Sequence, residues 1–468
     1  MQQLSNIDAS WLHGETEKTP FHVGNALMFE KPKAGLDLQA ALRELLANKL
    51  AHLPVLHRRL DPLSLKLANP VWINDPDLHW NYHVQRATVA APGGRDQFNE
   101  LLVQLHRPML DRNHPLWQVW LIEGLKGGAF ALYVKLHHAA SDGGAANILI
   151  ETLFSGVADP APQTPLLKEQ ERQPMELLWS TAMNYYVETP RKMASVMKQM
   201  LQATTVNANS GATLDTSQLK DLMPKAPKTP FNTGLTAERS YGMSTVPLAE
   251  VKALGKAHGG TVNDAVLAIC TGALRSYLEK RKQLPAQPLV VGMPVSVRGE
   301  GDATANNQIS MMLPILPVQE ADPSKWMPAI RKSVSAAKKW QEATRPIARL
   351  QVEMPSLRMP LFNNLGSMME AFKMAEDLRM TDRMPPFVNV WISNVPGSRT
   401  PLMFAGMPAR TNIPVGLVMH GAALNITIFS YLDRIEFGVL SCPNAVPDAQ
   451  EIADLLVAQL GALQEVAA

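Results

Sequence analysis

Along the chain, the spacing of hydrophobic residues changes between that of a strand and that of a helix. Each change of spacing predicts a new element. Apolar runs at residues 23–29, 117–125 and 129–138 predict strands. Lys126-Gly127-Gly128 separates the last two runs, which is typical of a hairpin. Leucines on one stripe of residues 36–51 predict an amphipathic helix. Strands and helices are therefore mixed in the first third of the chain.

A proline-rich stretch and a polar stretch interrupt this pattern after residue 158. Residues 159–165 predict a linker, residues 175–203 an amphipathic helical region, and residues 207–228 a polar connection. We therefore divide the chain into an N-terminal domain, a linker with a helical region and a C-terminal domain, with the bounds 1–158, 159–228 and 229–468.

The last of these domains again mixes strands and helices. Its helices are predicted at residues 262–280, 324–345, 349–378 and 448–466, and its strands at 289–297, 387–393, 422–431 and 435–440. A chain of 468 residues is too long for one ordinary core. The predicted fold class is therefore α/β, with two similar layered domains, each a mixed sheet flanked by helices.

Composition and charge narrow the possible partners. A formal net charge of +2, without a basic patch among aromatic residues, argues against nucleic acid. With Cys270 and Cys442 alone, we expect neither a disulfide framework nor a cysteine-based zinc site, and a reducing compartment fits. The N-terminus lacks a secretory signal pattern. The apolar residues 413–432 include Pro414 and Asn425, and predict two buried strands rather than a membrane span.

The run His137-His138-Ala139-Ala140-Ser141-Asp142-Gly143 carries the candidate chemistry, at the end of a predicted strand. Side chains alternate between the faces of a strand, so His138 continues the apolar row and His137 joins the polar set. A histidine at the end of a buried strand is held rigidly and partly desolvated, which favours a general base. Gly143 permits a sharp turn, and Asp142 can cap the next helix or hold a cation.

Other interpretations of the histidines stay open at this point. A histidine at a strand end is often a satisfied core residue. Two histidines and an aspartate are also metal-ligand types, but adjacent strand residues point in opposite directions and rarely bind one ion. A serine nucleophile is disfavoured, because the sequence has no Gly-X-Ser-X-Gly elbow.

The pattern His-His-X-X-X-Asp-Gly resembles the signature of the CoA-dependent acyltransferase superfamily. Other stretches are similar to the bacterial wax ester synthase/diacylglycerol acyltransferase family nearly from end to end. They are Asp8-Ala9-Ser10-Trp11, His22-Val23-Gly24, Pro115-Leu116-Trp117 and the segments 227–232, 263–268, 294–298 and 393–397. The departures are Phe21 and Ala265, where methionine and valine are common, and neither touches the chemistry.

The resemblance implies two chloramphenicol-acetyltransferase-like domains with a tunnel between them. It implies an acyl-CoA-dependent O-acyltransferase that esterifies a long-chain fatty alcohol or diacylglycerol to wax ester or triacylglycerol, with acyl-CoA as a substrate and no cofactor. We expect a cytoplasmic protein that could bind peripherally to the inner membrane or to lipid droplets. The alternatives are a condensation-type acyltransferase that uses a carrier-protein thioester, and a lipid-binding protein without activity.

Two polar residues begin the helix predicted at residues 262–280. Thr261-Val262-Asn263-Asp264 resembles a capping box, so Asp264 is expected to cap the helix. A side-chain amide at a helix N-terminus can donate to a developing oxyanion. The resemblance therefore makes Asn263 a second catalytic candidate.

The remaining site candidates have a structural interpretation beside the functional one. Arg298 ends a buried strand, and we expect it to pair with Asp142 and brace the turn, together with His137 and Gly143. Ser393, Asn394 and Asn425 are expected to bind substrate, although they could instead cap a turn or face solvent. Trp117 is expected in the core.

Methionine-rich helical regions at residues 175–203 and 352–380 could contact lipid, because methionine suits adaptable apolar surfaces. The alternative is that both are core or inter-domain helices.

The brace predicts an effect on stability as well as on activity. Asp142→Ala should lower the melting temperature together with turnover, because a buried Arg298 would lose its partner. Thermal unfolding of the variant checks this, and an unchanged melting temperature would show that Asp142 braces nothing.

Overall fold

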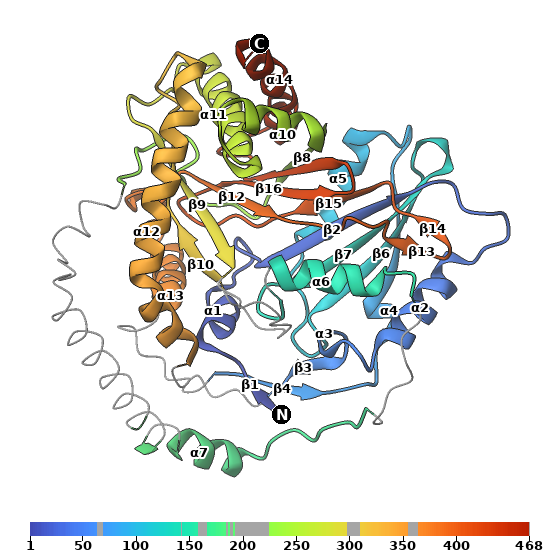
Figure 1. The fold of residues 1–468 in the computed structure, drawn as a ribbon. Helices are drawn as coiled ribbons and strands as arrows, with labels where there is room; N and C mark the ends of the chain where they lie inside the picture. Colours follow the sequence, from blue (N-terminus) through green and yellow to red (C-terminus); the bar gives the residue numbers. More distant parts are fainter. Residues whose placement is uncertain are drawn as a thin grey trace.

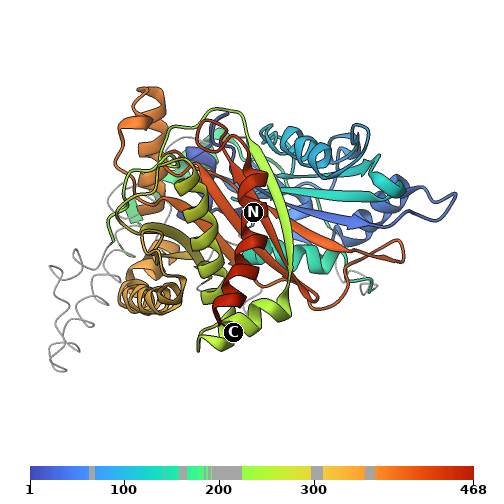
Figure 2. The same ribbon diagram turned by 90° about the horizontal axis from the view of Figure 1, so that it is seen from above.

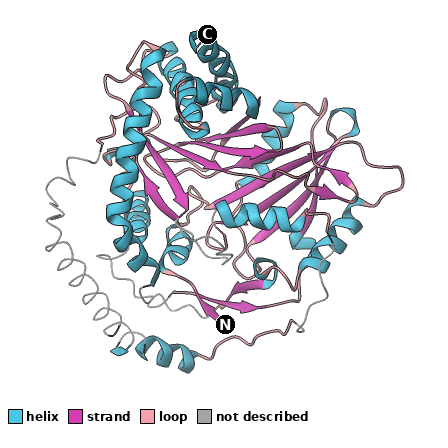
Figure 3. Ribbon diagram, viewed as in Figure 1, coloured by secondary structure: helices cyan, strands magenta, loops and turns pink. Residues whose placement is uncertain are grey.

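The structure is a computed structural model that describes residues 1–62, 69–141, 143–157, 166–183, 186–187, 191, 224–296, 309–353 and 364–467. Two mixed sheets lie side by side, with helices on their outer faces (Figures 1 and 3). The second half of the chain, coloured yellow to red, lies beside the blue and teal first half (Figure 2). The predicted α/β class is therefore confirmed.

The first sheet has five strands in the order β15-β2-β7-β6-β5. Its strands are β2 (His22–Phe29), β5 (Val84–Thr88), β6 (Trp117–Glu123), β7 (Phe130–His137) and β15 (Thr411–Val415). β6 and β7 form the predicted antiparallel hairpin, and only β5 and β6 pair in parallel.

Helices cover both faces of this sheet. The apolar stripes of α2 (Leu38–Lys49) and α6 (Gly143–Leu153) pack against one face, and α5 (Arg95–His106) packs against the other. Because both faces are covered, every residue of β7 is buried, including the polar ones.

The second sheet has seven strands, with the order β10-β9-β12-β16-β17-β8 and β11 paired to β9. The strands are β8 (Ser240–Pro247), β9 (Leu289–Ser296), β10 (Ile309–Met312), β11 (Ile315–Leu316), β12 (Val390–Val395), β16 (Leu424–Tyr431) and β17 (Arg434–Ser441). β12 runs parallel to both of its neighbours, and β16 and β17 form the predicted hairpin.

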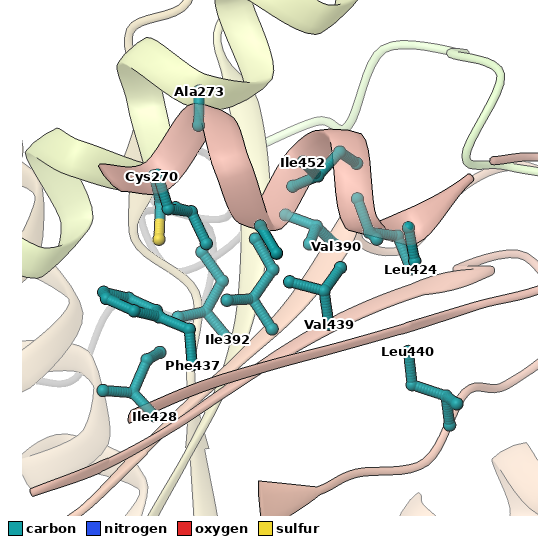
Figure 4. Packing of buried hydrophobic residues seen from close by; sticks show 14 of the residues in the cluster. Cys270, Ala273, Val390, Ile392, Leu424, Ile428, Phe437, Val439, Leu440 and Ile452 are labelled. Carbon is teal, nitrogen blue, oxygen red and sulfur yellow. The ribbon is translucent and has the colours of Figure 1, made fainter. Parts of the chain in front are cut away.

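Three helices close the core over this sheet: α10 (Leu248–Ala257), α11 (Val262–Lys280) and α14 (Ala449–Ala467). Side chains of α11 and α14 interdigitate with those of β12, β16 and β17 (Figure 4). Within the described chain α11 has the predicted bounds, because its apolar face is long and its capping box fixes the start.

β15 joins the two sheets. It follows most of the second sheet in sequence, yet it pairs with β2 along the register from Thr411↔Met28 to Val415↔Gly24. Where it crosses β17, a Cβ on Gly438 would lie 1.9 Å from the carbonyl oxygen of Pro414. The Tyr241 hydroxyl donates to the same oxygen at 2.7 Å. The close approach requires glycine at this position and fixes the two halves against each other.

The remaining described elements border these sheets. The small strands are β1 (Gln2–Gln3), β3 (Arg58–Leu60), β4 (Val71–Asn74), β13 (Met403–Phe404) and β14 (Met407–Pro408). The other helices are α1 (Asn6–Gly14), α3 (Pro54–His57), α4 (Trp80–His83), α7 (Pro174–Met183), α12 (Trp326–Glu353) and α13 (Asn364–Asp377).

Three further predictions can be compared with the described residues. The helical region predicted at 175–203 begins as α7, but most of the remainder lies outside the described residues. Residues 349–378 divide between α12 and α13. The apolar residues 413–432 lie in β15, β16 and the loop between them, as predicted, and no helix in the described ranges is long and apolar enough to cross a membrane.

Candidate functional site

The histidine pair lies where β2 begins and β7 ends. β7 stops at His137, which is paired with His22, and the N–H of Ala140 donates to the carbonyl of His137 at 2.9 Å to close a turn. The N–H of His138 donates to the carbonyl of Phe21 at 2.8 Å. His138 is therefore the first residue of the turn. The strand ends one residue earlier than predicted, and the prediction that His138 continues its apolar row stays a prediction.

The two histidines have different surroundings. His137 is 1% exposed, whereas His138 is half-buried. The imidazole of His138 stacks on the indole of Trp11 in α1, with 4.1 Å between ring centroids and 26° between planes. His138 is thus the histidine of the pair that solvent or a substrate can reach.

Both ring nitrogens of His137 are engaged inside the protein. Nδ1 accepts the N–H of Ala139 at 3.0 Å, so in the neutral ring the proton lies on Nε2. Nε2 is 3.2 Å from Oε1 of Glu15, the residue that follows α1. The prediction that His137 joins the polar face of β7 and supports its neighbour is consistent with this contact.

Glu15 gathers several donors around a buried carboxylate. Its Oε1 accepts the N–H of Phe21 at 3.4 Å, and its Oε2 is 2.9 Å from Nη2 of Arg112. Burial by itself raises the pKa of Glu15, but the contacts with His137 and His22 lower it well below its ordinary range. Glu15 is therefore an ionised carboxylate buried beneath the histidine pair.

A second polar layer lies behind Glu15. Nε2 of His22 is 3.4 Å from Oε1 of Glu15, and burial, with the charge of Lys135, lowers the pKa of His22 to about 4. Nζ of Lys135 donates to the carbonyls of Leu105 and Pro108 at the end of α5. Burial lowers the pKa of Lys135 to about 7, and Glu15 opposes that shift. The polar face of β7 thus ties α5 to the same site.

The Asn263 candidate lies at the N-terminus of α11, beside the end of β12. Thr261 and Asp264 form the predicted capping box, with N–H of Thr261 donating to Oδ2 of Asp264 at 2.8 Å. Nδ2 of Asn394 donates to Oδ1 of Asn263 at 3.4 Å, which leaves the amide N–H groups of Asn263 as donors. The structure brings these two predicted residues together.

A hydrogen bond links this region to the helix that follows the histidine motif. Nδ2 of Asn147 in α6 donates at 2.9 Å to the carbonyl of Pro396, just after β12 and its residues Ser393 and Asn394. Ser393 is half-buried.

Asn425 is buried and engaged inside the protein. Its Nδ2 donates to the carbonyl of Leu417 at 2.8 Å, and its Oδ1 accepts the hydroxyl of Thr427 at 2.7 Å. Both side chains are buried, so Asn425 does not face solvent. Trp117 lies in the core as predicted, and its Nε1 donates to the carbonyl of Leu56 at 3.0 Å.

Several predicted residues fall outside this picture. Asp142 and Arg298 lie outside the described residues, so the predicted brace stays a prediction. Gly143 is the first residue of α6. Among the side chains that are described, no three of the His, Cys, Asp or Glu type gather as metal ligands would.

The sequence interpretation missed Glu15 and gave no role to Trp11 or His22. The last two lie in stretches that resemble the family, which was the available signal. Glu15 had no local signal, because its partners come from distant segments.

The chain matches two family models. Residues 4–266 match the wax ester synthase/diacylglycerol acyltransferase catalytic domain, and residues 305–464 match the C-terminal domain of the same family. A Mycobacterium tuberculosis protein named as a diacylglycerol O-acyltransferase is 33% identical over 98% of this chain and 99% of its own length. The O-acyltransferase WSD of Acinetobacter baylyi is 31% identical over 97% of this chain and 94% of its own length.

Solved structures give the same result for the fold. The wax ester synthase/diacylglycerol acyltransferase of Marinobacter aquaeolei VT8 is similar over the whole of both chains, with a TM-score of 0.64 and 26% identity. The first condensation domain of the calcium-dependent antibiotic synthetase has a TM-score of 0.58 at 14% identity, over 100% of this chain and 96% of that one. The second likeness concerns the fold alone.

The buried carboxylate predicts how stability depends on pH. Glu15→Gln should lower the free energy of unfolding by about 2–4 kcal/mol near neutral pH, because Arg112 loses its counter-charge and His137 loses a charged acceptor. The depressed pKa of Glu15 means that its contribution is fully present above the ordinary value of 4.5 and is lost as the pH falls below it. Urea unfolding between about pH 7 and pH 3 should therefore show a shallower acid loss in the variant.

Glu17→Gln is the matched control, because Glu17 is an exposed carboxylate on the same loop. Equal acid slopes for Glu15→Gln and the unchanged chain would mean that Glu15 is not ionised in the fold.

Proposed function

Since the chain belongs to the wax ester synthase/diacylglycerol acyltransferase family, we propose that it transfers a long-chain acyl group from CoA to an alcohol hydroxyl with His138 as the general base. The chain is an acyltransferase of this type, which takes an acyl donor and an alcohol or diacylglycerol acceptor. The donor, the base and the supporting residues are the proposal.

In the proposed reaction, the unprotonated ring nitrogen of His138 takes the proton from the acceptor hydroxyl as its oxygen attacks the thioester carbonyl. The negative oxygen of the tetrahedral intermediate accepts hydrogen bonds, and the amide of Asn263 is the side-chain donor that we assign to it. Collapse breaks the carbon–sulfur bond. The CoA thiolate leaves and receives the proton from His138, which returns the neutral base and an ester.

The observation that carries the choice of His138 is the contrast within the histidine pair. His137 is buried and has Nδ1 bonded to Ala139 and Nε2 facing Glu15, so a substrate proton has no path to it. His138 is half-buried and its ring is held by Trp11. Partial burial keeps a base reactive while leaving it reachable.

Removing the base should abolish most turnover without unfolding the chain. We expect His138→Ala to lose about 10²- to 10⁴-fold in turnover, the usual contribution of general base catalysis. The assay is release of CoA thiol upon mixing palmitoyl-CoA with hexadecanol or with diacylglycerol. His79→Ala, at an exposed histidine, serves as the matched control. A folded His138→Ala enzyme with unchanged turnover would falsify the mechanism.

The alternative is an acyltransferase that takes the acyl group from a carrier-protein thioester. Its only support is the fold that the chain shares with condensation domains. Offering the same acyl group on CoA and on an acyl carrier protein separates the two donors. The proposal expects the CoA thioester to be the better donor.

We also propose that α7 contacts the surface of a lipid phase. Its apolar side chains are exposed: Met175 74%, Leu178 52%, Trp179 70% and Met183 40%. A helix with large apolar side chains and a tryptophan facing water suits the interface of a membrane or droplet. Figure 1 places α7 at the lower edge of the molecule, away from both sheets.

Ion pairs anchor the segment that leads into α7. Nε of Arg172 lies 2.5 Å from Oδ2 of Asp61, and Nζ of Lys168 lies 2.9 Å from Oδ2 of Asp77. Oε1 of Glu171 lies 2.7 Å from Nη2 of Arg59, a residue of β3 in the small sheet with β4. The start of α7 is therefore fixed to the body of the protein, which supports a defined surface for its apolar residues.

Removing this apolar surface should weaken binding to lipid. In the double variant Leu178→Ser and Trp179→Ser, two large apolar side chains are no longer transferred from water into lipid. The fraction of protein that sediments with phosphatidylglycerol–phosphatidylethanolamine vesicles should therefore fall by at least about tenfold. Val457→Ser, at an exposed valine of α14, is the matched control. Equal vesicle binding by the double variant and the unchanged chain would contradict the proposal for α7.

A further inference from the structure

The ring beneath His138 has a part in the proposed reaction that goes beyond packing. When His138 takes a proton, its neutral imidazole becomes an imidazolium, and the new positive charge must be stabilised in a partly desolvated place. A cation over the face of an aromatic ring, best of all tryptophan, is attracted by the negative charge of that face. The indole of Trp11 is in this position, 4.1 Å away and nearly parallel.

We infer that Trp11 is a positioning residue for the general base: its indole face orients the His138 ring and stabilises the imidazolium that forms during acyl transfer. The inference rests on the proposed role of His138. It assigns to Trp11 an effect on the rate and on the acidity of His138, rather than contact with the reacting atoms.

Trp11 is held firmly enough to orient another ring. It is 3% exposed and contacts the edge of Phe21, with ring centroids 5.1 Å apart at 75°. Phe21 is the residue whose carbonyl accepts the N–H of His138. The same small cluster therefore fixes both the backbone and the ring of the base.

α1 itself is fixed at both ends. At its start, the side chain of Ser5 accepts the N–H of Asp8. At its end, Gly14 packs so closely on Met369 of α13 that a Cβ would lie 2.6 Å from the Cβ of Met369. Glu15 follows directly and faces His137. The indole Nε1 has no hydrogen-bond partner among the residues described, so packing alone orients the ring.

The charged groups described near this end of β7 gather around His137. Glu15 faces His137 and Arg112, and His22 is kept neutral with its pKa near 4. These groups lie around the neighbouring histidine. Trp11 is the ring that the structure stacks on His138 itself.

The inference is tested by the acid limb of the pH profile of kcat/KM, which reports the ionisation of the free base. Trp11→Phe keeps a ring with a weaker face, and Trp11→Leu keeps apolar volume without a ring. We expect kcat to fall in the order Trp, Phe, Leu, by about 3- to 30-fold in total, as the range of cation–π strength implies. The pKa of the acid limb should fall in the same order, because the imidazolium loses stabilisation.

Trp326→Leu is the matched control, since Trp326 is buried to the same 3% but lies in α12. It should leave the acid limb in place. An acid limb unmoved in Trp11→Phe and Trp11→Leu, with both variants folded by their melting curves, would overturn the inference. If Trp11→Leu does not fold, Trp11→Phe alone decides between the outcomes.

This test separates Trp11 from the base itself. If His138 is not the base, His138→Ala stays active and the proposed function fails. If His138 is the base but Trp11 only fills space, the Trp11 variants lose activity or stability while the pKa of the acid limb stays the same.

Discussion

A buried carboxylate holds the candidate active site together. Glu15 is ionised although it is buried, and such a charge is costly by several kcal/mol unless donors surround it. Its donors come from the start of β2, the end of β7 and the loop with Arg112, and each must be in place for the charge to be tolerated. One interaction therefore fixes several distant segments. The result is a histidine that is locked, next to one that remains accessible.

The architecture delivers these segments to one place. The start of β2 meets the end of β7 because the two strands are paired over their whole length, and β15 attaches the second half of the chain to the same sheet. α13 packs on α1 from that half. The surroundings of His138 thus draw on both halves of the chain, although the histidine motif belongs to the first. This arrangement suits an enzyme that brings an acyl donor and an alcohol together.

The sequence pattern predicted the elements whose formation depends on residues close together along the chain. The β6–β7 hairpin and α11 follow from apolar periodicity and turn or capping residues. α1 escaped prediction because polar and apolar residues alternate from Asn6 to Trp11, so the sequence shows no helical period, and Asp8 and Ser10 are buried all the same. The contact of Glu15 with His137 and the pairing of β15 with β2 join residues far apart in sequence. The predicted strand also ran one residue too far, since β7 ends at His137 and His138 begins the turn.

The central claim is that His138 accepts the proton while His137 holds the site in shape. The pH dependence of kcat/KM for His137→Gln tests it most directly, because glutamine keeps a donor for Glu15 but cannot act as a base. The account predicts that this variant, although slower and less stable, keeps an acid limb of slope one like that of the unchanged enzyme. A folded His137→Gln enzyme that retains turnover but has lost its acid limb would identify His137 as the titrating base and contradict the account.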